Sequence, residues 1–126
     1  MAQCANTDAE IEACFDVMAE LRPHLKQDQF LSTVRNMEGD GFRLIYRAKH
    51  NKVVAAAGYR IYSNLFMGKH LYVDNLVSAD AQRSSGYGTR MIEWLRDKAK
   101  SNSCKFFHLD SGTQRGRAHK FYFQEF

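Results

Sequence analysis

The chain has 126 residues, of which 44% are hydrophobic and 25% charged, and its net charge is +4. This length allows one domain with a buried core and is too short for two, so we expect a single domain over residues 1–126. Met1–Thr7 lacks the basic start and apolar centre of a signal peptide, and no apolar run approaches the ~20 residues that a membrane span needs. We therefore expect a soluble, cytoplasmic protein without a membrane partner.

The cysteines and the basic residues exclude further classes. Cys4, Cys14 and Cys104 are an odd and widely spaced set, which indicates reduced thiols and neither a disulfide framework nor a metal site. Basic side chains cluster only within residues 115–120. A small nucleic-acid-binding domain stays an alternative, but the chain has no recognised binding motif, so nucleic acid is not expected as a partner.

Two helices are predicted near the N-terminus. Thr7-x-x-Glu10 has the capping-box pattern, and apolar residues then recur at helical spacing up to Leu21. Pro23 should end this helix near Arg22. Gln27–Met37 has a second apolar face at helical spacing, so a second helix is expected there.

Three strands with short links should follow as an antiparallel meander. The predicted strands are Phe42–Arg47, Val53–Tyr62 and His70–Val77, and Gly58 is a candidate bulge in the second of them.

A further helix is predicted from Gly88 to about Asn102, followed by a short apolar strand at Lys105–Asp110. A strand, a helix and a strand in this order imply a crossover, which would place Lys105–Asp110 parallel to Leu71–Val77. Gln114–Phe126 carries apolar residues at roughly helical spacing, which predicts a last helix. The fold class is therefore α/β with a mixed sheet: an antiparallel meander plus a parallel pair, flanked by helices.

This arrangement leaves the edge of the Lys105–Asp110 strand without a neighbour. Unpaired backbone groups at a sheet edge invite another strand. We therefore expect either that the chain continues beyond Phe126 or that a partner subunit covers this edge, as in a homodimer.

The loop between the third strand and the next helix carries the sequence Arg83-Ser84-Ser85-Gly86-Tyr87-Gly88. Two glycines let the backbone approach a ligand, and the free N–H groups of the helix start favour an anion, most naturally a phosphate. A plain glycine turn with a serine cap remains an alternative for the loop taken alone. A dinucleotide fingerprint needs a small residue where Met91 stands, and a P-loop needs Lys-Ser/Thr after its second glycine.

Arg83-x-x-Gly86-x-Gly88 resembles the Arg/Gln-x-x-Gly-x-Gly/Ala loop of the GNAT N-acetyltransferases, which cradles the pyrophosphate of coenzyme A. Val73-Asp74-Asn75-Leu76-Val77 stands where that family has the strand entering the loop, and residues 118–122 resemble its Ala-x-x-Phe/Leu-Tyr helix. The resemblance implies a GNAT-like fold in which the further C-terminal strand of the family is absent. It also implies direct transfer of an acetyl group from acetyl-CoA, as cosubstrate, to a primary amine: a small amine, a polyamine, or a protein lysine or N-terminus. The alternative is a coenzyme A-binding domain with weak catalysis.

The resemblance also assigns roles to residues. Tyr122 would be the general acid for the departing thiolate. Asp74 is a candidate general base acting through water, with a purely structural hydrogen bond as the alternative. The expected cofactor-binding residues, for the pantetheine arm and acetyl carbonyl and then for the pyrophosphate, are Leu76, Val77 and Ser78, then Arg83, Ser85, Gly86, Tyr87, Gly88 and Thr89.

The amine acceptor is not fixed by these motifs. Acidic residues on the first two helices, such as Glu10, Asp16 and Glu38, would suit a polyamine or a lysine side chain. Acidic helix faces also serve solubility alone, so both explanations stay open.

Overall fold

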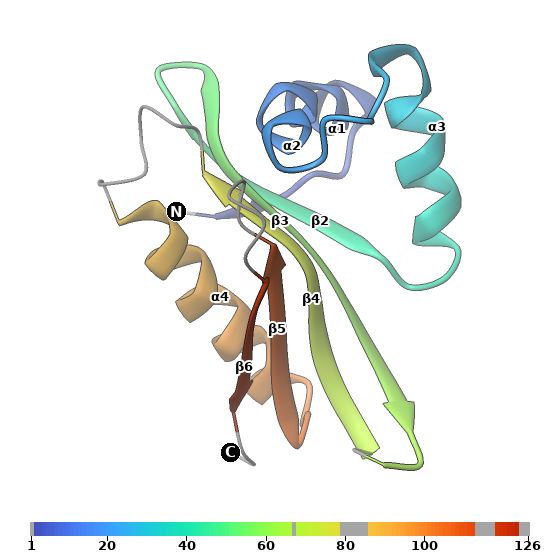
Figure 1. Ribbon diagram of the computed structural model, residues 1–126, viewed down its shortest axis with the longest axis vertical. Helices are drawn as coiled ribbons and strands as arrows, with labels where there is room; N and C mark the ends of the chain where they lie inside the picture. The colour runs from blue at the N-terminus through green and yellow to red at the C-terminus, as the bar shows by residue number, and fades with distance from the viewer. Residues whose placement is uncertain (1, 67, 79–85, 113–117, 124–126) are drawn as a thin grey trace.

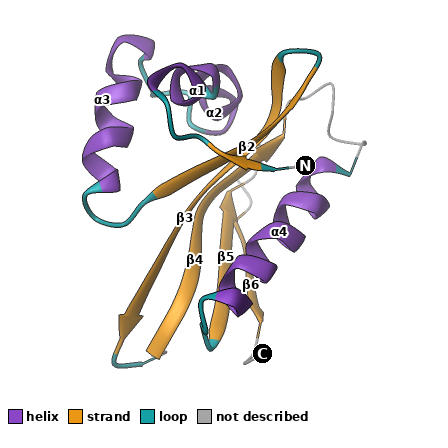
Figure 2. Ribbon diagram, turned by 180° about the vertical axis from the view of Figure 1, so that it is seen from behind, coloured by secondary structure: helices purple, strands orange, loops and turns teal. Residues whose placement is uncertain are grey.

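The protein is described from a computed structural model, which covers residues 2–66, 68–78, 86–112 and 118–123. One six-stranded sheet in the order β1-β2-β3-β4-β5-β6 forms its centre (Figure 1). The strands are β1 (Gln3–Cys4), β2 (Arg43–Lys49), β3 (Lys52–Asn64), β4 (Gly68–Ser78), β5 (Phe106–Gly112) and β6 (Ala118–Phe123). The helices are α1 (Asp8–Ala13), α2 (Phe15–Leu21), α3 (Gln27–Glu38) and α4 (Tyr87–Ser101). Helices α1–α3 cover one face of the sheet and α4 covers the other (Figure 2).

The capping box predicted at the first helix is confirmed. The Thr7 hydroxyl accepts the Glu10 N–H at 3.1 Å, and the Glu10 carboxylate accepts the Thr7 N–H at 3.0 Å. The other carboxylate oxygen accepts the Tyr46 hydroxyl at 2.7 Å, which ties the helix start to β2. The single helix expected up to Arg22 is instead two, because the Cys14 N–H bonds back to Ile11 O and tightens the turn between α1 and α2.

The antiparallel meander is also confirmed. Strands β2, β3 and β4 pair antiparallel in sequence order. His50 and Asn51, both with positive φ (53° and 62°), make the tight connection between β2 and β3. The sequence did not indicate β1, whose two residues pair with Tyr46 and Ile45.

A bulge interrupts the ladder between β3 and β4. Tyr59 pairs with Val73 and Gly58 pairs with Asn75, so Asp74 is an extra residue on β4. The bulge lies at Gly58, as predicted, but the extra residue belongs to β4 and not to β3. Gly58 has a different role: a Cβ atom at this position would overlap the Phe42 ring. The glycine thus lets that ring lie directly on the sheet.

The crossover through α4 is confirmed, and it buries a second core. Met91, Leu95 and Ala99 of α4 pack in one cluster with Leu71 and Phe107 of the sheet. The parallel pairing of β4 with β5 is short, because only His70–Val73 of β4 pair with Phe106–Leu109 of β5. Beyond Leu109, β5 continues along β6 and the described residues show no further β4–β5 pairing.

The helix predicted over Gln114–Phe126 is wrong for Ala118–Phe123, which form β6 and pair antiparallel with β5. The run Phe121-Tyr122-Phe123 has high strand propensity, and pairing satisfies the backbone groups of β5 from Phe107 onward. The expected absence of a C-terminal strand is therefore wrong too. The edge assigned to a partner subunit is covered within the chain, so it no longer argues for a homodimer. Residues 114–117 and 124–126 lie outside the described residues.

The Gly58–Phe42 contact gives a stability prediction. We expect Gly58→Ala to lower the free energy of unfolding by about 1–3 kcal/mol, because the added methyl group displaces the Phe42 ring. Gly88→Ala is the matched control, since a Cβ there meets nothing within 4 Å and the helix should gain up to about 1 kcal/mol. Urea unfolding of the two variants beside the parent measures both. A Gly58→Ala protein as stable as the parent would contradict this packing.

The carboxylate of Glu10 gives a pH prediction. Hydrogen bonds, first from the Thr7 backbone and then from the Tyr46 hydroxyl, lower its pKa from 4.5 to about 2. Because the folded-state pKa is the lower one, the stabilisation is present above pH 4.5 and is lost as the pH falls towards 2. Glu10→Gln keeps an acceptor but no charge, so its melting temperature should lie below that of the parent at pH 7 and converge with it by about pH 2. The exposed Glu12 of the same helix supplies the control Glu12→Gln, and a gap that persists unchanged at pH 2 would refute the assignment.

Candidate active site

The last five residues of β4 have one open edge. Towards β3, Leu76, Val77 and Ser78 pair with Ala57, Ala56 and Ala55. Towards β5, the described residues give no strand partner beyond Val73. Backbone groups of Asp74–Ser78 that point away from β3 can therefore form hydrogen bonds with an extended ligand, as a sheet edge does with an added strand. The three residues predicted to contact a pantetheine arm, Leu76 to Ser78, all lie on this edge.

The start of α4 has the geometry of an anion site. Gly86 precedes the helix in the left-handed region, with φ of 77°, and the first bond back along the helix is Arg90 N–H to Gly86 O at 3.1 Å. The N–H groups of Tyr87, Gly88 and Thr89 thus have no acceptor within the helix. Among the described residues, nothing lies within 4 Å of a Cβ at Gly88, which leaves the backbone there open to a ligand. Arg83 and Ser85, also predicted for this site, lie outside the described residues.

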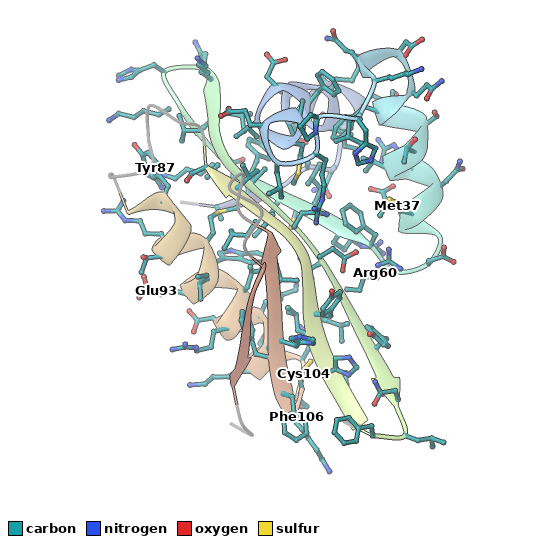
Figure 3. The ribbon with its side chains drawn as sticks, in the orientation of Figure 1. Met37, Arg60, Tyr87, Glu93, Cys104 and Phe106 are labelled. Atoms are coloured by element: carbon teal, nitrogen blue, oxygen red, sulfur yellow. The ribbon has the colours of Figure 1, made fainter. Side chains whose placement is uncertain are left out.

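Arg47 is a cation beside this helix start that the sequence analysis missed. Its guanidinium carbon lies 5.1 Å from the centre of the Tyr87 ring, which Figure 3 shows at the beginning of α4. Its Nε is buried and has no hydrogen-bond partner among the described residues. The register Arg47–Ala55–Ser78 places it in the same row as the end of β4. The sequence did contain a signal for this position. Arg47 follows Ile45 by two residues in a strand, so it lies on the same face of the sheet as that buried side chain.

Asp74, the candidate general base, sits at the bulge with one oxygen bonded and one not. Arg60 Nε donates to Oδ2 at 3.2 Å, whereas Oδ1 is buried without a partner among the described residues. Burial raises the pKa of Asp74, and this effect outweighs the lowering by Arg60 and Arg22. A half-buried carboxylate with a raised pKa is typical of functional sites, although ion-pair networks show it too.

Three more polar residues surround Asp74, and the sequence analysis assigned none of them. Arg22, just past the end of α2, donates from Nε to Asn75 Oδ1 at 3.0 Å and from Nη2 to Asp74 O at 3.4 Å. Arg60 also lies over the Phe42 ring, with its guanidinium carbon 5.9 Å from the ring centre. Figure 3 shows Arg60 below the helices α1–α3 in this view, near the middle of the long β3–β4 hairpin. The missed signal was the break in alternation between Val73 and Leu76, which marks the bulge.

Tyr122 lies in a different row of the sheet, and only its backbone is described. It pairs with His108, which pairs in turn with Tyr72 of β4. Tyr72 precedes Leu76 by four positions, or roughly 13 Å along the strand. The row that contains the Tyr122 backbone therefore meets β4 two positions before Asp74 and four positions before Leu76. Its role as general acid stays a prediction.

Two kinds of feature are absent from the described residues. No helix in the described ranges has the length and apolar character to cross a membrane. The described residues also contain no group of three or more His, Cys, Asp or Glu side chains placed to hold a metal ion.

Comparison with known proteins identifies the family. The sequence profile of the Acetyltransferase (GNAT) family matches residues 9–126. An uncharacterized N-acetyltransferase of Bacillus subtilis, YhdJ, is 28% identical over 109 residues, which cover 86% of this chain and 77% of that protein. A GNAT family acetyltransferase of Staphylococcus aureus has the same fold, with a TM-score of 0.79 at 17% identity, over 94% of this chain and 91% of that one.

A further solved structure, AAC(6')-Iy in complex with the bisubstrate analogue CoA-S-monomethyl-acetylneamine, matches with a TM-score of 0.72 at 13% identity. The match covers 90% of this chain and 78% of that one. The profile match spans nearly the whole sequence, and the mixed sheet agrees with it. The chain therefore belongs to the GNAT acetyltransferase family.

Proposed function

We propose that this protein is an N-acetyltransferase that moves an acetyl group directly from acetyl-CoA to a primary amine. The observation that carries the proposal is the open β4 edge at Asp74–Ser78 together with the α4 start, whose first N–H groups have no acceptor within the helix. A long ligand with an extended arm and a phosphate group matches this pair of features. Acetyl-CoA has both, in its pantetheine arm and its pyrophosphate.

Donor binding would use both features at once. Tyr87, Gly88 and Thr89 would donate backbone N–H groups to the pyrophosphate, with Arg47 as an added positive charge nearby. The pantetheine arm would lie along Leu76–Ser78. The related fold of AAC(6')-Iy, whose complex holds a coenzyme A conjugate, supports this choice of donor.

The reaction removes two protons from the amine nitrogen and adds one to the sulfur. An amine with a pKa of ~10.4 is protonated in water and must lose its first proton before its nitrogen attacks the thioester carbon. The new C–N bond creates a tetrahedral oxyanion, which backbone N–H groups of β4 would stabilise. The attached nitrogen then loses its second proton, and when the C–S bond breaks the thiolate takes up a proton. Asp74 is the candidate base through water, and Tyr122 the candidate acid.

The three cysteines are free thiols, which suits the cytoplasmic location that we infer for this activity.

A second candidate function is a coenzyme A-binding domain with weak catalysis. It is favoured by the position of Tyr122, whose row meets β4 at Tyr72, four positions before Leu76. The two differ in whether bound acetyl-CoA is consumed when amines are supplied.

Donor binding can be tested by thermal shift. Acetyl-CoA at ~100 times its Kd should stabilise the fold by about 2.7 kcal/mol, while NAD and ATP should do much less. Gly88→Val should abolish most of this shift, because a branched side chain would fill the open space at the helix start. Asp97→Val, at an exposed position of the same helix, should keep it. An equal shift with NAD, or a full acetyl-CoA shift in folded Gly88→Val, would refute the assignment.

The role of Tyr122 can be tested by removing one hydroxyl group. If Tyr122 protonates the thiolate, Tyr122→Phe should lower kcat by ~10²–10⁴-fold and leave acetyl-CoA affinity and unfolding free energy nearly unchanged. If the phenol is only structural, stability should fall by roughly 1 kcal/mol and kcat of the folded protein should hold. Turnover and unfolding measured on the same sample separate the two. Full kcat in the variant would leave water as the proton donor.

A further inference from the structure

Four polar side chains form a charged cluster at the β4 bulge: Arg22, Arg60, Asp74 and Asn75. The hydrogen bonds Arg60–Asp74, Arg22–Asn75 and Arg22 to the Asp74 carbonyl connect them, at 3.2, 3.0 and 3.4 Å. The cluster lies on the sheet face that carries α1–α3 and is adjacent to the open β4 edge. It contains two cations and one carboxylate, so it carries one excess positive charge.

Much of the bonding capacity of this cluster is unused. Arg60 donates only through Nε, and its two terminal amino groups have no hydrogen bond among the described residues. Arg22 donates from Nε and Nη2, and its Nη1 has no hydrogen bond to the described residues. The Arg60 side chain is 32% exposed and that of Asp74 18% exposed, so solutes can reach the pair. A salt bridge that served stability alone would gain from bidentate contact, which is absent here.

Two of the acidic residues considered as an attraction for polyamines, Glu10 and Glu38, have partners elsewhere. Asp8 and Glu38 both pair with Arg35, at 2.6 and 3.0 Å. Glu10 is bonded to Thr7 and Tyr46. The cluster at the bulge itself has two cations and one carboxylate, which does not suit a polycation.

We propose that the acceptor is a primary amine that carries an anionic group, a carboxylate or a phosphate, close to its nitrogen. The free donors of Arg60 and Arg22 would bind the anion, and the unpaired Oδ1 of Asp74 would accept a hydrogen bond from the amine. The arginines and the aspartate thus match the two opposite charges of such a zwitterion. This inference rests on the proposed acetyltransfer and narrows its substrate class.

The first test is an acceptor panel of matched pairs. Each free amino acid of the kinds found in proteins is compared, as acceptor, with the amine that lacks its carboxylate. Phosphoethanolamine is compared with ethanolamine. Spermidine represents the polyamines. Release of the coenzyme A thiol gives kcat/KM for each. We expect the anionic member of the best pair to exceed its partner by about 10–100-fold, the value of one or two charge-assisted hydrogen bonds. The carboxylate and phosphate pairs distinguish the two sources of the anion.

Variants then connect the preference to the cluster. Arg60→Gln should remove most of the preference through a higher KM for the anionic acceptor, with the acetyl-CoA thermal shift unchanged. Arg60→Lys should recover part of it, which a merely structural role would not predict. If Arg60→Gln does not fold, Arg22→Gln takes its place. Arg35→Gln is the matched control, because Arg35 lies on α3 in exposed ion pairs, and it should keep the preference.

The outcomes separate this inference from the proposed function. Equal kcat/KM within every pair, or a preference for spermidine, overturns the anionic acceptor and leaves acetyltransfer intact. A preference that persists in folded Arg60→Gln and Arg22→Gln overturns the role of the cluster. No turnover with any amine overturns acetyltransfer and this inference together.

Discussion

The extra residue in β4 is the constraint on which the candidate site depends. Because Asp74 has no counterpart on β3, the carboxylate and the amide of Asn75 lie side by side, where Arg22 and Arg60 can reach them. The parallel pairing with β5 stops one residue before the bulge. The irregularity and the open edge thus occur at the same place. Gly58 complements them, because its missing side chain lets the Phe42 ring lie directly on β3.

The cluster around Asp74 lowers the stability of the fold but leaves polar groups available to bind a ligand. A buried oxygen without a partner costs about 1–3 kcal/mol, and an ion pair held through one nitrogen returns little of that. The two cores on either side of the sheet supply the compensation. Ile11, Leu71, Leu95 and Phe107 are all fully buried, and each contributes about 1.5–3 kcal/mol on burial. Rigid packing around the site is what allows a half-satisfied carboxylate to persist.

Local signals in the sequence were enough for most of the fold. The capping box at Thr7 and Glu10, the helical spacing along α3 and α4, and the alternation in β2 each encode structure within a few residues. Asp74 and Leu76–Ser78 were proposed from a motif, and the structure shows that they occupy the bulge and the open edge of β4. β1 was missed because two residues are too few for a pattern. The last segment was mispredicted because Phe121, Tyr122 and Phe123 suit either period, and pairing with β5 decides between them. Arg22 and Arg60 escaped because their partners lie 52 or 53 and 14 positions away.

The bulge also bears on how such a site can arise. Leu71 and Val73 belong to the core on the α4 side, and Leu76 packs against that same core, three positions after Val73 instead of two. Deleting Asp74 alone would therefore restore regular alternation and leave Val73, Leu76 and Val77 on their present faces. A one-residue deletion in a central strand normally turns every following side chain to the wrong side. Here it would remove the carboxylate and spare both cores, so a single codon separates a plain β4 from one that carries a charged cluster.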